Sequence, residues 1–234
     1  MANLTFKEFE NFFKYYKSED QQRSGIRVLY DQMRDVLKDD EHAWVKIYRD
    51  KPEVTSSTIL SVPYQSQNDN SSGSGFRECF SSSCAMIAMY YGKIDNDDAY
   101  NLVRQKYGDS TDAQAQVRAL RSLGLEANFI SNGSTSDLKA AIDAGRPVPV
   151  GWLHHGLATS ASGNGHYSVV IGYDDKAWVM NDPNGEADLS AGGYTSNTDG
   201  NNQSYSFKNF NPRWIVEGEG SGWYMDIRDP NAKK

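Results

Sequence analysis

The hydrophobic period of this chain changes once along its length, and this change limits the folds available to it. Up to about residue 145, apolar side chains recur every three or four residues, as in DDAYNLVRQKYG, TDAQAQVRALRSLG and TSDLKAAIDAG. Beyond that point they fall in short aromatic and β-branched runs between Gly, Asp and Asn: PVPVGWL, HYSVVIGY, KAWVMND, PRWIVEG and GWYMDI. Helices followed by strands predict an α+β domain.

A separate helical unit is predicted to precede this domain. Thr5 and Glu8 have the spacing of a capping box, and an apolar stripe follows at helical intervals, formed by Phe6, Phe9, Phe13 and Tyr16. Two more helices are expected over about residues 19–38 and around Trp44. We therefore predict a small helical bundle over residues 1–50, a linker over 51–58 with little apolar periodicity, and the main domain over 59–234.

Charge and hydropathy exclude several classes of protein. The 234 residues include 24 Lys and Arg and 31 Asp and Glu, a net charge of −7 with no basic block. A nucleic-acid partner is not expected for such a chain. No stretch approaches the roughly 20 apolar residues of a membrane span. Charges interrupt the first residues, so no secretory signal is predicted there.

The two cysteines occupy different positions in one predicted helix. Cys79 comes just before its first apolar residue, where the helix dipole and free backbone N–H groups favour the nucleophilic thiolate. Cys84 shares a face with Phe80, Ile87 and Tyr91, so it is predicted to be a core residue. A disulfide between the two, or a structural zinc site, is not expected.

A thiolate nucleophile needs a base and a group that orients the base. Among the four histidines, only His166 has a suitable partner, because it opens one strand and Asp182 follows the next. An odd-numbered turn of Tyr173, Asp174 and Asp175 would place His166 directly across from Asp182 on one face. A turn of even length would place them on opposite faces.

Five separately spaced motifs between about residues 59 and 184 resemble the papain-like cysteine peptidases related to bacteriocin-processing, double-glycine-leader peptidases. They are VPYQSQNDN, ECFSSSCAMIAMYYG, DAGRPVPVG, GHYSVVIGYDD and WVMNDPNG, in that order. The resemblance implies a papain-like fold, in which a helical subdomain carries the nucleophile at a helix N-terminus and packs on an antiparallel sheet. It also implies that no metal or organic cofactor is needed.

By this resemblance Cys79 is the nucleophile, His166 the general base, Asp182 its orienting acid and Gln67 the oxyanion-hole amide, with Gln65 as the neighbouring alternative. The chain departs from the family pattern in two places. Serines occupy positions 81–83, where the family has residues of the Gly-Pro-Ala type, and the segment LHHGLATSASGNG before His166 is long.

Aromatic residues near these motifs are candidates to line a substrate groove: Tyr64, Trp152, Tyr167, Trp178 and Trp214. We place Tyr64, Trp152 and Tyr167 among the substrate-binding residues. His154 and His155 are expected to be loop residues, of which one is a candidate to touch substrate.

The resemblance extends to the modules of bacteriophage and bacterial cell-wall lysins, since the chain has no GxxxxGK[ST] loop of an export transporter. We expect hydrolysis of amide bonds in peptidoglycan peptides, at the cell wall after release through a membrane lesion or as part of a virion. The helical unit would bind wall polymer or a phage structural protein. The alternatives are an inactive phage structural or binding module and a peptidase that acts on proteins.

Overall fold

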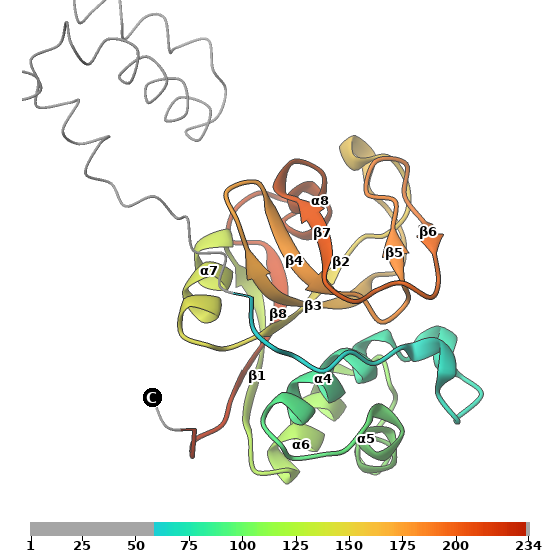
Figure 1. Ribbon diagram of the computed structural model, residues 1–234, viewed down its shortest axis with the longest axis vertical. Coiled ribbons are helices and arrows are strands. Elements are labelled where there is room, and N and C mark those ends of the chain that lie inside the picture. Colours follow the sequence, from blue (N-terminus) through green and yellow to red (C-terminus); the bar gives the residue numbers. More distant parts are fainter. Residues whose placement is uncertain (1–58, 233–234) are drawn as a thin grey trace, which may run out of the picture. The chain divides into compact units, whose positions relative to one another are not determined.

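The computed structural model of the chain describes residues 59–232 (Figure 1). The predicted bundle over 1–50 and the linker over 51–58 lie outside these residues and remain predictions. The described part is a mixed domain in which an antiparallel sheet carries helices on both faces, as the α+β prediction requires.

The main sheet has six antiparallel strands in the spatial order β1-β8-β2-β3-β4-β7. Their bounds are β1 Glu126–Gly133, β2 Val148–Trp152, β3 His166–Tyr173, β4 Ala177–Asn181, β7 Gln203–Ser206 and β8 Gly222–Arg228. Two short strands, β5 (Glu186–Ala187) and β6 (Tyr194–Ser196), form a separate hairpin.

Two groups of helices cover the sheet, and each buries its own apolar cluster (Figure 1). On one face lie α4 (Cys79–Tyr90), α5 (Asp97–Arg104) and α6 (Ala113–Ser122); on the other lie α7 (Thr135–Asp143) and α8 (Phe207–Trp214). Strand residues alternate between the two clusters, so that Val169 packs under α4 while Val170 packs on the opposite side. Three short 3₁₀ turns complete the order: η1 (Gln67–Asp69), η2 (Gly75–Arg77) and η3 (Ala158–Ser160).

Helix α4 is buried on every side rather than along one stripe. All residues from Phe80 to Ala88 are buried, Cys84 completely. The serines at 81–83 tolerate this burial because each reaches a different element. Ser81 accepts a hydrogen bond from Gln116 of α6, Ser82 donates to Asp97 at the start of α5, and Ser83 donates to a carbonyl of β3. Three side-chain hydrogen bonds thus fix the helix that begins at Cys79.

The turn between β3 and β4 differs from the predicted one. The last β3–β4 pair is Tyr173 and Trp178, so four residues lie between the paired positions instead of three. The Asp174 carboxylate stabilises this turn by accepting hydrogen bonds from the amides of Lys176 and Ala177. A β-bulge between Val170 and Gly172 adds one residue to β3 and restores the parity that an even turn would have lost. Extending the register past Val169 and Asn181 sets Asp182 opposite Ser168. His166 is therefore on the same face as Asp182 but not directly across from it.

One predicted strand is wrong, and others were not predicted. PRWIVEG is not extended: its first residues end helix α8, in which Phe210 and Trp214 are buried one turn apart and Pro212 faces outward. Edge strands β1 and β7 escaped prediction because polar residues such as Asn128 and Gln203 weaken their alternation. Among the described residues, no helix is both long and apolar enough to span a membrane.

Candidate active site

The two thiols have opposite environments, as their positions in the helix predict. Cys79 is the first residue of α4 and is partly exposed, so it lies at the positive end of the helix. Cys84 is fully buried, and desolvation raises the pKa of its thiol far above the usual range. Both are free cysteines. Only Cys79 is placed to react as a thiolate.

His166 and Asp182 form a buried pair. The Nε2 atom of His166 lies 2.7 Å from Oδ1 of Asp182, and the exposed fractions of the two residues are 4% and 0%. Since an ionised carboxylate only accepts hydrogen bonds, Nε2 carries the proton in this contact. Nδ1 is then the ring nitrogen that remains for the thiol of Cys79.

Both Asp182 and Cys79 influence the pKa of His166. Burial alone would lower the pKa of His166, but the charges of Asp182 and Cys79, and hydrogen bonds to both, raise it to about 10. An imidazolium flanked by a carboxylate and a thiolate is the resting state that nucleophilic attack by sulfur requires. The site thus brings Cys79, His166 and Asp182 together.

Asp182 is held by groups that no pattern in the sequence indicates. Its carboxylate accepts hydrogen bonds from the hydroxyl of Tyr205 at 3.0 Å and from the backbone amide of Asn184 at 3.0 Å, with the Tyr194 hydroxyl at 3.4 Å. Tyr205 lies on β7, an unpredicted edge strand, and Tyr194 lies on β6 inside a polar loop. No local motif connects either tyrosine with position 182, so sequence alone offers no signal for them.

The backbone around Asp182 is equally constrained. Its amide donates to the carbonyl of Gly200, and its own carbonyl accepts from the Tyr64 hydroxyl at 3.1 Å. A Cβ atom on Gly200 would lie 1.9 Å from that carbonyl oxygen, so a side chain cannot fit there. Tyr64, a predicted substrate-binding residue, thus also fixes the backbone of the orienting acid.

The two candidate glutamines, Gln65 and Gln67, have different hydrogen-bond partners. Gln65 is committed elsewhere, because its amide oxygen accepts from the backbone of Asp97 at the start of α5. Gln67 is buried beside the turn that leads to Cys79, and its Nε2 donates to the carbonyl of Gly75 at 2.9 Å. One N–H of Gln67 remains beyond that bond. We therefore keep Gln67 as the candidate oxyanion donor.

The other two predicted substrate-binding residues, Trp152 and Tyr167, pack against neighbouring aromatic rings. Trp152 pairs with His166 across β2 and β3, is only 2% exposed, and meets the imidazole edge-on at 5.5 Å. Its burial does not fit the expected contact with substrate, and it supports His166 instead. Tyr167 stacks on Phe80 with the rings 3.6 Å apart, and it covers Gly151, where a Cβ would lie 2.7 Å from its ring.

A loop with two histidines adjoins His166. The ring centre of His154 lies 5.6 Å from that of His166 and 3.9 Å from that of His155, and its buried Nδ1 has no hydrogen-bond partner among residues 59–232. The fully buried Arg213 of α8 fixes this loop by donating to the carbonyls of Leu153, His155 and Gly156, and it also donates to Leu189 on the neighbouring segment.

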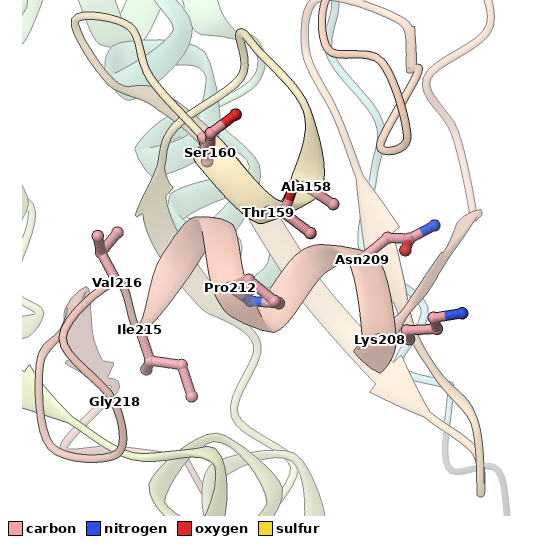
Figure 2. Close-up of a pocket in the computed structure, with 10 residues that line it drawn as sticks. Ala158, Thr159, Ser160, Lys208, Asn209, Pro212, Ile215, Val216 and Gly218 are labelled. Atoms are coloured by element: carbon pink, nitrogen blue, oxygen red, sulfur yellow. The ribbon is translucent and has the colours of Figure 1, made fainter.

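A pocket of about 520 Å³ opens elsewhere, between η3 and α8 (Figure 2). Its lining includes Thr159, Lys208, Pro212 and Val216 but none of the predicted site residues. Within residues 59–232, no group of three or more His, Cys, Asp or Glu side chains is arranged to hold a metal ion.

A family model described as "Peptidase_C39 like family" matches residues 59–219. No curated protein matches the sequence. Similar solved structures include a double glycine motif protease from a transporter, in complex with its leader peptide; the two chains are 20% identical over 73% of this chain and 93% of the other, with a TM-score of 0.47.

Two further solved structures are similar over comparable spans. The peptidase domain of a bi-functional Streptococcus ABC transporter is 21% identical over 65% of this chain and 92% of its own, with a TM-score of 0.44. A C39-like peptidase from Bacillus anthracis is 16% identical over 71% of this chain and 96% of its own, with a TM-score of 0.45.

Proposed function

Because this chain belongs to the Peptidase_C39-like family, we propose that it is a cysteine peptidase that cleaves amide bonds with Cys79, His166, Asp182 and Gln67. The observation that carries the proposal is the buried His166–Asp182 pair beside a cysteine at a helix N-terminus. A binding role would not require an imidazole with a raised pKa next to a free thiol.

The reaction is acyl transfer in two halves. The sulfur of Cys79 bonds to the amide carbonyl carbon, and the carbonyl oxygen becomes an oxyanion that accepts hydrogen bonds from Gln67 and a backbone amide near Cys79. The imidazolium of His166 gives its proton to the leaving nitrogen as the C–N bond breaks. His166 then removes a proton from water as the water oxygen bonds to the acyl carbon. The C–S bond breaks, the acyl group leaves as an acid, and the thiolate and imidazolium are restored. Asp182 keeps the imidazole oriented throughout.

For the substrate we propose peptides of bacterial peptidoglycan, in the stem or the cross-bridge. The lysin-like arrangement of a predicted helical unit before the peptidase domain supports this choice. The protein would act at the cell wall, after release through a membrane lesion or from a virion, with the unit over 1–50 binding wall polymer or a phage structural protein. A net charge of −7 gives no general attraction to anionic wall polymers, so recognition must be local.

Cleavage of peptides or proteins outside the wall is the second candidate. Its support is the similarity to a protease whose structure contains a leader peptide. An inactive module with the same fold is the non-enzymatic alternative.

One experiment separates these three functions. Wild type, Cys79→Ala and Cys84→Ala are each incubated with purified peptidoglycan and with a denatured protein, and new amino termini are identified by mass spectrometry. We expect release from peptidoglycan by wild type and by the Cys84→Ala control, and none by Cys79→Ala. Release from denatured protein alone would favour the second candidate, and no release from either would favour the inactive module. Release that survives Cys79→Ala would exclude the proposed nucleophile.

A further inference from the structure

The residue directly before the nucleophile is a buried carboxylate. Glu78 is 3% exposed and is the N-cap residue of α4, yet its side chain makes no capping bond to that helix. A buried carboxylate is stable only where hydrogen-bond donors surround it, so the contacts of Glu78 show which segments it holds.

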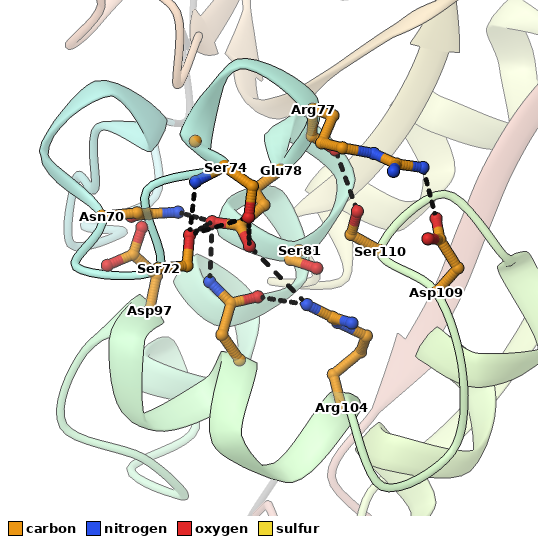
Figure 3. A network of polar contacts seen from close by, with 12 residues as sticks. Asn70, Ser72, Ser74, Arg77, Glu78, Ser81, Asp97, Arg104, Asp109 and Ser110 are labelled. Carbon is orange, nitrogen blue, oxygen red and sulfur yellow. Dashed lines mark hydrogen bonds and ion pairs between the residues drawn. The ribbon is translucent and has the colours of Figure 1, made fainter.

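The side chain of Glu78 instead collects donors from two separate segments (Figure 3). From the polar loop that follows η1 come the Asn70 amide at 2.7 Å, the Ser72 hydroxyl at 2.8 Å and the Ser74 hydroxyl at 3.4 Å. From α5 come the Asn101 amide at 3.3 Å and the guanidinium of Arg104 at 3.8 Å. Glu78 thereby binds a Gly- and Ser-rich loop to a helix.

The same loop ends at Gly75, whose carbonyl accepts a hydrogen bond from the side chain of Gln67. The carbonyl of Gly75 accepts both the backbone amide of Glu78 and the Nε2 of Gln67, each at 2.9 Å. A Cβ on Gly75 would lie 2.0 Å from the Gln67 carbonyl oxygen, so the two backbones are in direct contact. The orientation of the Gln67 amide therefore depends on where this loop is fixed.

We propose that Glu78 is a positioning residue for the oxyanion site: by holding the loop from Asn70 to Gly75, it sets the Gln67 amide for the developing oxyanion. The inference rests on the proposed function. It differs from a purely structural role, since it predicts that Glu78 influences reactions that create an oxyanion and not reactions of the thiolate alone.

Two reagents distinguish these reactions at Cys79. Iodoacetamide alkylates the sulfur by displacing iodide, so no carbonyl oxygen gains charge and Gln67 is not needed. The aldehyde N-acetyl-glycyl-glycinal adds to the sulfur, its carbonyl electron pair moves to oxygen, and that oxygen occupies the oxyanion position. Protection of Cys79 from iodoacetamide by increasing aldehyde concentration measures the second reaction without a known substrate.

We expect Glu78→Gln and Gln67→Ala each to raise the aldehyde concentration for half-protection by about 10-fold or more. Glu78→Gln should leave the alkylation rate constant within about 2-fold of wild type. Ser72→Ala, which removes one donor and leaves the carboxylate, should give a smaller shift in the same direction and serves if Glu78→Gln does not fold. The matched control is Asp109→Asn, which breaks the exposed ion pair between Asp109 and Arg77 of η2. It should change neither the aldehyde concentration for half-protection nor the alkylation rate constant.

Equal losses of protection and alkylation in Glu78→Gln and Ser72→Ala, accompanied by a lower melting temperature, would overturn the proposal in favour of a structural role. Unchanged protection in both variants would also overturn it, as would a wild type that is alkylated but never protected by the aldehyde. Failure of the proposed function looks different: Cys79 of folded wild type would then be no more reactive toward iodoacetamide than a simple thiol.

Discussion

His166 donates from Nε2 to Oδ1 of Asp182 over 2.7 Å, and the carboxylate has no exposed surface. This contact fixes the tautomer and the plane of the imidazole, and it leaves Nδ1 for the thiol. Replacement of Asp182 by Asn removes the charge while keeping the shape. We expect Asp182→Asn to lower the rate of amide hydrolysis by about 10²- to 10⁴-fold, measured on whichever substrate wild type cleaves.

The control for this variant is Asp199→Asn, an exposed acidic residue in the segment that returns to β7. It should keep wild-type turnover. If Asp182→Asn also kept wild-type turnover, Asp182 would not be the orienting acid.

The pKa of His166 provides a test that needs no substrate. The charges of Asp182 and Cys79 raise this pKa to about 10 against the effect of burial, so removing either partner should lower it. NMR titration of the His166 ring in wild type, Asp182→Asn and Cys79→Ala measures the change directly. A midpoint in both variants equal to that of wild type would contradict the assigned contacts.

The same shift has a consequence for stability. The folded pKa of His166 lies above its unfolded value of about 6.5, so the stabilisation is fully present below pH 6.5 and is lost as the pH rises toward 10. In urea unfolding, wild type should lose more stability over this range than Asp182→Asn does. Parallel curves for the two proteins would show that the pair does not couple protonation to folding.

His154 should act in the opposite direction. Burial, assisted by His166 and His155, lowers the pKa of His154 to about 4. Between pH 4 and 6.5 the unfolded chain then binds a proton at this position that the folded protein excludes, so stability falls as the pH falls. His154→Phe should have a shallower acid slope than wild type in unfolding experiments, with the exposed His155→Phe as the comparison. Equal slopes in wild type and His154→Phe would contradict this.

Gly200 tests how closely the backbone is packed behind the orienting acid. In Gly200→Ala the new methyl group meets the Asp182 carbonyl and the Tyr64 hydroxyl, which lies 2.6 Å from the Cβ position. Displacing Asp182 should cost about 1–3 kcal/mol in unfolding free energy and should reduce turnover as well. Asn201→Ala, at the exposed neighbouring position, should do neither. A fully stable and active Gly200→Ala would show that the contact is relieved without moving Asp182.

Local patterns in the sequence predict the elements that carry the site but not what surrounds them. The helix at Cys79 follows from its apolar spacing, and the strands around His166 follow from their β-branched and aromatic residues. Register is harder, because it depends on the bulge near Gly172 and on the Asx turn at Asp174. The predicted three-residue turn puts His166 on the correct face, but in the structure a longer turn and a bulge produce this result.

Long-range polar contacts lie beyond such prediction. Tyr205 reaches Asp182 from an edge strand 23 positions away, and Arg213 lies in a segment whose aromatic and β-branched residues predict a strand. Pro212 disfavours a helix there, because it lacks an N–H and its ring crowds the preceding turn, yet it lies within α8. Only the packed fold reveals these partners.

Arg213 contacts the loop beside the site solely through main-chain oxygens, those of Leu153, His155 and Gly156. Main-chain oxygens are present whatever side chains the loop carries. The shape of this loop can therefore persist while its exposed side chains are exchanged, which makes residues 157–164 a natural place to alter what the peptidase accepts without disturbing His166.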